Sequence, residues 1–122
     1  MTPFGEKLRA LRAERRLTLT QMADGLGVSA AYLSALEHGH RGRPNRRFVH
    51  RVCHYLNIIW DEAEELQALA DRSHPRAVID TAGLSTAATV FANRLAEQIG
   101  SLPEELLARW LDELEKAPGK SR

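Results

Sequence analysis

The sequence predicts an all-α protein made of a five-helix domain, a short linker and a C-terminal helical hairpin. Two observations predict this fold class. Apolar residues recur at three- and four-residue spacing along most of the 122 residues, which is typical of helices that bury one face. Capping residues and glycines interrupt this pattern repeatedly, so they divide it into separate helices.

Amphipathic helices are predicted over residues 4–16 and 18–26. The first carries its apolar positions Phe4, Leu8 and Leu11 between charged residues. The second begins with a capping box, since Thr18 is followed three residues later by Gln21. Gly27 is expected to end it.

A third helix is predicted over residues 30–38, between an N-cap at Ser29 and a stop at Gly39. Only about three residues separate it from the second helix. Two short helices joined by a glycine-containing turn of this length form a helix-turn-helix. Gly27 supplies the positive φ that so steep a turn usually needs.

Two further helices are expected to complete a first domain over residues 1–75. The apolar positions of the fourth are Phe48, Val49, Val52, Cys53 and Leu56, and Asn57 closes it in the left-handed conformation. The fifth begins near Asp61 with an acidic first turn and has Ala63, Leu66, Leu69 and Ala70 on one face, up to a stop at residues 73–75. Between them, Ile58, Ile59 and Trp60 are expected in the core or in an interface.

Residues 76–84 lack a helical period and include the β-prone pair Val78 and Ile79, so they are expected to form a linker or a short extended segment. Residues 85–117 are predicted to form a helical region. Ser85 caps a sixth helix that Gly100 ends, and a second capping box, Ser101 with Glu104, opens a seventh. Residues 118–122 are expected to be a frayed tail.

The charge of the chain is unevenly distributed. Residues 1–60 contain ten Lys and Arg against four Asp and Glu, a net charge of +6, whereas the remainder has a net charge of −5. This asymmetry favours contact between the first half and a polyanion. The alternative is that the Arg-rich helices only have solvated faces.

The helix-turn-helix region carries a familiar set of residues. These are Arg12, Leu17-Thr18, Met22-Ala23, Gly27-Val28-Ser29, Tyr32-Leu33-Ser34, Leu36-Glu37, Gly39 and Arg43-Pro44. With them, residues 4–72 resemble the repressor/Cro-type (XRE) helix-turn-helix family. The resemblance implies a sequence-specific DNA-binding protein, a bacterial transcriptional regulator, and most often a repressor, that binds a palindromic operator in double-stranded DNA as a homodimer.

The resemblance places the helix at about residues 29–38 in the major groove. The candidate base contacts are Ser29, Ala30, Ala31, Tyr32, Ser34 and Ala35. Alanine packs on thymine methyl groups but cannot form hydrogen bonds with base edges, so we expect T-rich recognition helped by DNA shape. The alternatives are that Ala30 and Ala31 are only helix formers and that Tyr32 has a packing role.

Phosphate contacts are expected from polar and cationic residues on either side of that helix. The candidates are Thr18, Thr20, Gln21, Arg41, Arg43, Asn45, Arg46 and Arg47. The family usually has Gln directly after the helix-opening Thr, where this chain has Leu19, so that contact is lost unless Thr20 or Gln21 replaces it. Gly25 is expected to weaken the second helix relative to Ala. The cationic turn could also be merely solvated.

Arg12 and Glu37 are expected to have a structural role. In the resemblance they pair across the first and third helices, and a guanidinium can form two parallel hydrogen bonds with a carboxylate.

No enzyme, cofactor or metal site is expected. His50 and His54 have a spacing that can share a metal, but Cys53 falls on the apolar face, and zinc needs four well-placed ligands. The chain shows no phosphate-binding loop or nucleophile motif, and Glu62, Glu64 and Glu65 are expected to form a solvated acidic run. One cysteine and the lack of a long apolar segment predict a cytoplasmic protein without a membrane span.

The hairpin is expected to form the dimer interface, because two short helices cannot hide an apolar stripe by themselves. The candidate interface residues are Leu95, Ile99, Leu106, Leu107, Trp110, Leu111 and Leu114, with Val78 and Ile79 as a swapped strand. Alternatively, the hairpin completes the monomer core. In a second function class, that of an antitoxin or an adaptor, its acidic helices bind a partner protein. No cluster of polar residues indicates a small effector.

Overall fold

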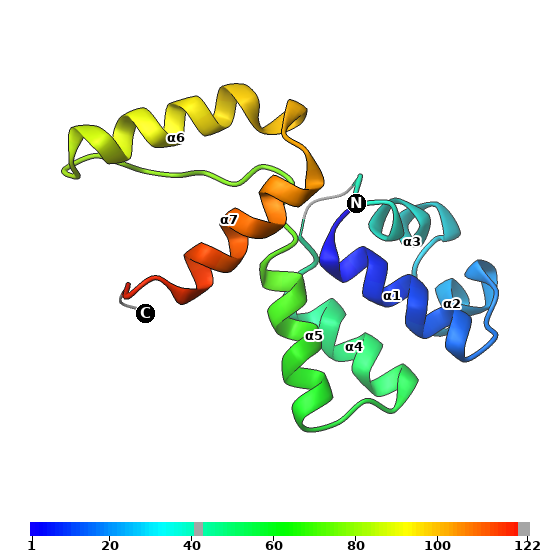
Figure 1. Cartoon of the computed structure of the whole chain (residues 1–122). Coiled ribbons are helices and arrows are strands. Elements are labelled where there is room, and N and C mark those ends of the chain that lie inside the picture. Colours follow the sequence, from blue (N-terminus) through cyan, green and yellow to red (C-terminus); the bar gives the residue numbers. More distant parts are fainter. Residues whose placement is uncertain (41–42, 120–122) are drawn as a thin grey trace. The chain divides into compact units, whose positions relative to one another are not determined.

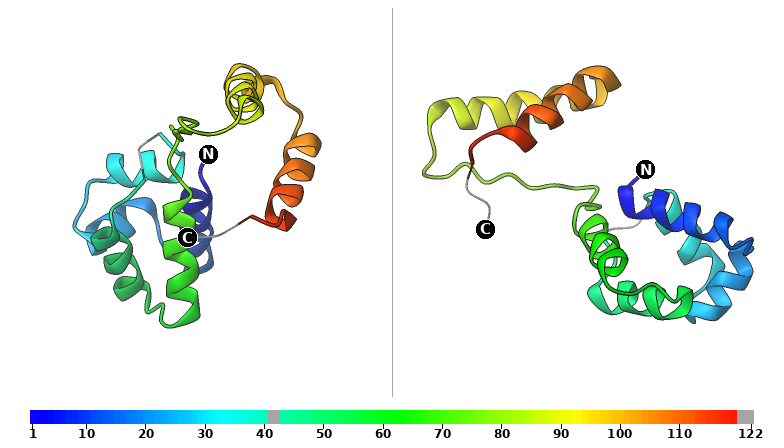
Figure 2. Two further views of the ribbon diagram at one scale, coloured as in Figure 1. Left: turned by 90° about the vertical axis from the view of Figure 1, so that its left-hand side faces the viewer. Right: turned by 60° about the horizontal axis from the view of Figure 1, so that its bottom comes forward.

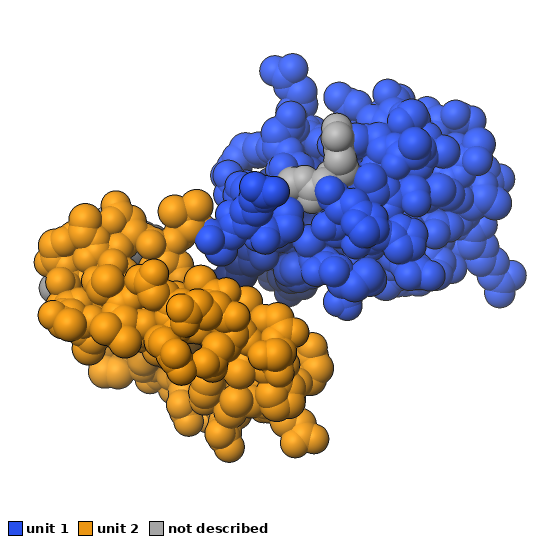
Figure 3. Space-filling model, turned by 90° about the horizontal axis from the view of Figure 1, so that it is seen from above, with its two compact units in different colours: residues 1–77 blue, residues 78–122 orange. Residues whose placement is uncertain are grey.

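The computed structural model describes residues 1–40 and 43–119, and within those residues every regular element is helical (Figure 1). The chain divides into two compact units, Met1–Ala77 and Val78–Arg122 (Figure 3). In the described residues no helix is both long and apolar enough to cross a membrane. Each unit is described by itself below.

The first unit contains five helices. They are α1 (Pro3–Glu14), α2 (Leu19–Leu26), α3 (Ala30–Glu37), α4 (Arg46–Leu56) and α5 (Asp61–Asp71). The predicted starts of α2, α3 and α5 are confirmed. The first helix begins one residue earlier than predicted, because Thr2 caps it by accepting a 3.0 Å hydrogen bond from the Gly5 N–H. Its predicted extension to Arg16 is wrong, since Arg16 adopts a positive φ of 55°.

The capping signals around the turn are confirmed. Thr18 Oγ1 accepts from the Gln21 N–H at 3.1 Å, and Gln21 Oε1 accepts from the Thr18 N–H at 2.8 Å. Gly27 (φ 71°) and Asn57 (φ 57°) end α2 and α4 in the left-handed conformation. The Ser29 hydroxyl accepts from the Tyr32 N–H and caps α3. These signals fix the ends of the helices and hence the angle of the turn.

The core of the first unit forms where α1 packs on α3 and α5, α2 packs on α3 and α4, and α4 packs on α5 (Figure 2). Its largest fully buried side chains include Phe4, Leu8, Met22, Leu26, Leu33, Leu66, Val49 and Val52. Ile58 is buried as expected, but Ile59 and Trp60 are exposed. Their placement in the core is therefore wrong, and the interface alternative remains a prediction.

Two glycines allow close packing that the sequence pattern does not indicate. A Cβ on Gly5 would overlap the carbonyl oxygen of Leu36 and lie 2.9 Å from that of Glu37. A Cβ on Gly25 would overlap the ring of Tyr55. Gly25 therefore makes room for a side chain of α4, so the expectation that it only weakens α2 is incomplete.

The second unit contains α6 (Thr86–Gln98), a 3₁₀ turn (Ile99–Ser101) and α7 (Glu104–Lys116). Ser85 caps α6 as predicted, accepting from the Ala88 N–H. Gly100 lies within the 3₁₀ turn, so α6 ends before it. No residue that the structure describes in this unit is buried, and Val78 and Ile79 are exposed outside any strand.

The predicted capping box of Ser101 and Glu104 is wrong. Pro103 is the N-cap of α7, and Leu102 is extended at φ −77°, ψ 136°. A residue directly before proline is disfavoured in the α region, so the helix cannot begin at Leu102. The Ser101 hydroxyl instead donates to the carbonyl oxygen of Gln98.

Candidate nucleic-acid interface

The turn between α2 and α3 is held by backbone hydrogen bonds at the end of α2. The Gly27 N–H donates to the Asp24 carbonyl at 3.2 Å and the Val28 N–H donates to that of Ala23 at 3.0 Å. Val28 also packs against the core. The relative direction of the two helices is thereby fixed by local contacts.

The candidate base-contacting residues differ in accessibility. Ser29 and Ala31 are exposed, while Ser34 and Ala35 are half-buried. Ala30 and Tyr32 pack against the core. The accessible face of α3 is thus formed by small side chains, which let a helix approach a surface closely.

Tyr32 contributes to packing inside the first unit. Its ring meets that of Phe48 edge-on, with the centroids 5.7 Å apart and the planes at 85°. This contact joins α3 to α4, as the packing alternative for Tyr32 requires. The half-buried ring keeps part of its surface accessible.

Two histidines follow the accessible face of α3, and the sequence patterns did not single them out for this position. His38 and His40 are exposed and stack with their ring centroids 6.2 Å apart. His38 Nδ1 lies 2.8 Å from the carbonyl oxygen of Ser34. The only sequence signal was their location in the basic half of the chain.

The polar phosphate candidates have local roles as well. Thr18 and Gln21 form the capping box, and Thr20 is exposed beside them. Asn45 caps α4 by accepting a 2.7 Å hydrogen bond from the Phe48 N–H. All four residues are exposed, so these groups lie at helix N-termini on the surface.

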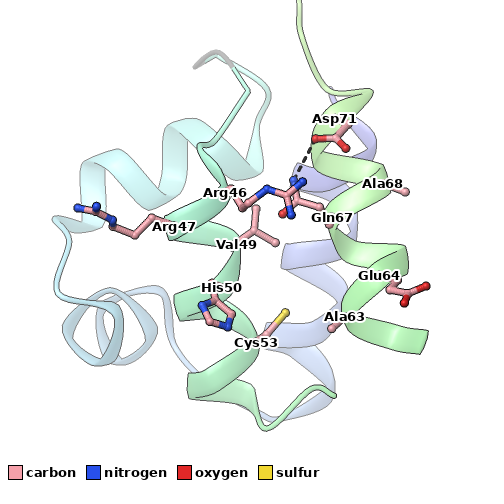
Figure 4. A pocket seen from close by; sticks show the side chains of 10 residues that line it. All are labelled: Arg46, Arg47, Val49, His50, Cys53, Ala63, Glu64, Gln67, Ala68 and Asp71. Atoms are coloured by element: carbon pink, nitrogen blue, oxygen red, sulfur yellow. Dashed lines mark hydrogen bonds between the residues drawn. The ribbon is translucent and has the colours of Figure 1, made fainter. Parts of the chain in front are cut away.

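The cationic candidates lie at and before the start of α4. Arg43, Arg46 and Arg47 are exposed, whereas Arg41 lies outside the described residues. Figure 4 shows that Arg46 points toward Gln67 of α5, while Arg47 points away from α5. The side chains of these two neighbouring arginines therefore lie on different surfaces of the first unit.

Three other arginines of the basic half stabilise the fold. Arg12 donates to both carboxylate oxygens of Glu37, from Nε at 2.8 Å and from Nη2 at 3.0 Å. Arg51 donates to the Leu26 carbonyl at the end of α2, and Arg15 to the Leu56 carbonyl at the end of α4. Three of the arginines that contribute to the +6 charge therefore form hydrogen bonds within the domain.

The Arg12 and Glu37 pair joins α1 to the end of α3. The Glu37 side chain is 1% exposed and that of Arg12 is 21% exposed. Arg12 also donates to the Leu17 carbonyl at 3.1 Å. The hydrogen bond with Glu37 raises the pKa of Arg12, against the opposing effect of burial. The ion pair therefore holds α1 against the end of α3, and the carboxylate of Glu37 is its buried partner.

An open hollow of about 720 Å³ lies between α4 and α5 (Figure 4). Its lining includes Val49, Cys53 and Ala63, with Arg46 and Asp71 among its charged residues. Burial raises the pKa of the Cys53 thiol. His50 and His54 are exposed while Cys53 is buried, and within the described residues no group of three metal-ligating side chains comes together.

Comparisons with known proteins agree with this geometry. A family model described as a helix-turn-helix domain matches residues 3–69. The HTH-type transcriptional repressor RghR of Bacillus subtilis (strain 168) is 46% identical over 61 residues, which cover 50% of this chain and 45% of that protein. The uncharacterized HTH-type transcriptional regulator RghRB of the same strain is 38% identical over 61 residues, covering 50% and 44%.

The chain therefore matches just under half the length of these curated relatives. Among solved structures, a chain of the SinR protein/SinI protein complex is similar at 20% identity with a TM-score of 0.46, covering 92% of this chain and 94% of that one.

Proposed function

Since the chain belongs to the helix-turn-helix domain family, we propose that it is a sequence-specific DNA-binding regulator of transcription that acts as a repressor. The observation that carries this proposal is the placement of α3. Its accessible face consists of small side chains, and exposed arginines lie close after it in the sequence, at the start of α4. A helix of this kind fits the major groove, where base edges differ.

The accessible residues of α3 read the bases. Ala31 and Ala35 pack on thymine methyl groups, while the hydroxyl groups of Ser29 and Ser34 donate or accept at base edges. Tyr32 reaches DNA only with the part of its ring that Phe48 leaves accessible. Because few donors face the groove, DNA shape contributes to the recognition.

Phosphate contacts hold α3 in register. Arg43 and Arg47 supply cations, and Arg46 and the sequence-predicted Arg41 are further candidates. The exposed helix starts supply donors from Thr18, Thr20, Gln21 and Asn45. One further candidate donor is His40, which is exposed beyond the C-terminal end of α3.

Replacing Arg43 and Arg47 by Ala should weaken DNA binding equally for all sequences. Each lost phosphate contact releases fewer counterions on binding. The negative slope of log affinity against log salt should therefore become shallower by about one per contact. The measurement is a titration of labelled duplex by fluorescence anisotropy at several salt concentrations. The control is Arg9→Ala, an exposed cation of α1, which should keep the wild-type slope. A wild-type affinity that does not depend on salt would contradict phosphate binding altogether.

The protein is further proposed to bind a palindromic operator as a homodimer through the hairpin. A two-fold operator requires two recognition helices about 34–36 Å apart, hence a paired protein. The support is the second unit, where Trp110, Leu111 and Leu114 are exposed and no described residue is buried. Leu106 and Leu107 extend the apolar face of α7 at helical spacing, and Leu95 and Ile99 add apolar side chains at the end of α6 and in the 3₁₀ turn. Helices this short need such packing to be stable.

Leu111→Glu is expected to convert the dimer into a monomer at micromolar concentration. A carboxylate in an apolar dimer interface is desolvated without a partner, and Leu111 is exposed in the single chain, so the variant keeps its first unit folded. Sedimentation velocity measures the change. The control is Arg109→Glu, an exposed residue two positions before Leu111 and therefore on the opposite side of α7, which should remain dimeric. If Leu111→Glu stayed fully dimeric, the assignment of the hairpin to the dimer interface would be wrong. If the wild-type protein were a monomer, the result would favour binding of a partner protein, as in the antitoxin or adaptor alternative.

A further inference from the structure

Three contacts between α4 and the helix-turn-helix come from one face of α4. They are made by Phe48, Arg51 and Tyr55, whose spacing of three and four residues puts them on one side of the helix. The Phe48 ring meets that of Tyr32 on α3. The Tyr55 ring lies where a Cβ on Gly25 of α2 would be. Arg51 lies between these two ring contacts and reaches the end of α2.

The contact made by Arg51 is polar and directional, unlike the two ring contacts. Its Nη1 donates to the Leu26 carbonyl oxygen at 2.9 Å, and a Cβ on Gly27 would lie 4.0 Å from the same nitrogen. Apolar packing is largely non-directional and allows a helix to slide by a small amount, whereas a hydrogen bond has a narrow range of distance and angle. Arg51 therefore fixes the position of α4 relative to the turn between α2 and α3.

This hydrogen bond adds only modestly to the stability of the fold. Leu26 is the last residue of α2, and the last carbonyl groups of a helix have no partner within it. Arg51 is exposed, so water can take its place at that carbonyl, and the net contribution of such a bond to stability is small. Stability alone therefore does not explain an arginine at this position.

The two helices that Arg51 keeps in register have different tasks in the proposed function. The accessible face of α3 contacts the bases, while the exposed start of α4, with Asn45, Arg46 and Arg47, contacts phosphates. Phosphate contacts set the position and orientation of a protein on the duplex. The base contacts and the phosphate contacts can be made together only if α4 keeps one position relative to α3.

We propose that Arg51 is a positioning residue for sequence-specific DNA recognition. Its hydrogen bond to the Leu26 carbonyl holds α4 in register with α3, so that the phosphate contacts of α4 place α3 correctly against the bases. Arg51 needs no contact with DNA for this role. The inference rests on the proposed function. Its consequence is that Arg51 affects binding to the operator but not to other sequences, because non-specific binding depends on phosphate contacts.

Arg51→Met tests the proposal, because it removes the donor and keeps a long side chain. The probes are the labelled duplex that the wild-type protein selects from a random pool and a scrambled duplex of the same length. Fluorescence anisotropy should show at least about tenfold weaker binding to the selected duplex, comparable to the cost of one mismatched base pair. Binding to the scrambled duplex, and its salt dependence, should stay as in the wild type. No loss, or equal losses on the two duplexes, would overturn the proposal.

Two further variants separate positioning from charge and folding. Arg51→Lys keeps the charge and a donor, so it should restore most of the preference for the selected duplex; no recovery would contradict a role of the hydrogen bond. Arg15→Met removes the same charge and a similar bond, to the Leu56 carbonyl, and should keep the preference. An equal loss of preference in Arg15→Met would assign the effect to charge. If circular dichroism showed Arg51→Met to be unfolded at the assay temperature, the bond would be structural and the proposal wrong.

Failure of the proposed function gives a different result. The wild-type protein would then bind both duplexes equally or not at all, and the inference would be wrong with it. Failure of the inference alone appears as a wild-type preference that Arg51→Met retains. Arg47→Met, which removes a phosphate contact, should differ from Arg51→Met by weakening binding to both duplexes by the same factor and making the salt slope shallower.

Discussion

Arg12→Ala is expected to lower the free energy of unfolding by about 3–5 kcal/mol, the cost of removing one partner of a buried ion pair. The substitution leaves the carboxylate of Glu37, 1% exposed, without its two hydrogen bonds. Glu37 is also the last residue of α3, where the helix dipole disfavours a negative charge. Thermal unfolding followed by circular dichroism should show a Tm decrease of roughly 15 °C or more.

The two partners of this pair should not be equivalent. Glu37→Ala leaves Arg12, which is 21% exposed and still donates to the Leu17 carbonyl, so its loss of stability should be smaller. The control is Arg15→Ala, which removes a single hydrogen bond to the Leu56 carbonyl and should change little. If Glu37→Ala kept the wild-type Tm but lost DNA sequence preference, Glu37 would have a reading role and the structural assignment would be wrong.

Gly5→Ala is expected to destabilise the first unit by about 3 kcal/mol, in the range for overpacking a rigid contact. Alanine normally favours a helix over glycine, so the sign of the effect is diagnostic. The new Cβ would overlap the Leu36 carbonyl oxygen and crowd that of Glu37. Both are backbone atoms at the end of α3, so α1 and α3 must separate.

Chemical denaturation measures this effect, and Gly100→Ala is its control. A Cβ at Gly100 meets no atom within 4 Å, so that variant should be neutral or slightly stabilising. If Gly5→Ala were equally neutral, the close approach of α1 to α3 would not exist in solution.

Short-range signals explain what the sequence predicted correctly. Thr18, Ser29 and Asn57 act on backbone groups within four residues of themselves, so their effect is independent of the tertiary fold. The Ser101 prediction failed for the same kind of reason, because Pro103 constrains Leu102 directly. The restriction that Pro103 places on Leu102 is stronger than the capping pattern of Ser101 and Glu104, and it determines where α7 begins.

Long-range contacts account for what the sequence did not indicate. Gly5 and Gly25 are needed because Leu36 and Tyr55 approach them in the folded chain. Arg51 was counted among the cations of a basic half, yet it donates to the Leu26 carbonyl 25 residues away. The periodicity of a single sequence does not identify such partners. The arginines that bond within the domain can therefore be distinguished from those accessible to DNA only in the folded structure.

The proposed function requires that α3 reads DNA within a paired protein. Selection of bound duplexes from a random pool, at a salt concentration that suppresses non-specific binding, tests it most directly. We expect enrichment of a T-rich half-site repeated in inverted orientation, with the centres about 10–10.5 base pairs apart or a multiple of that spacing. A pool that binds but stays random in sequence, or that does not bind at all, would contradict the claim.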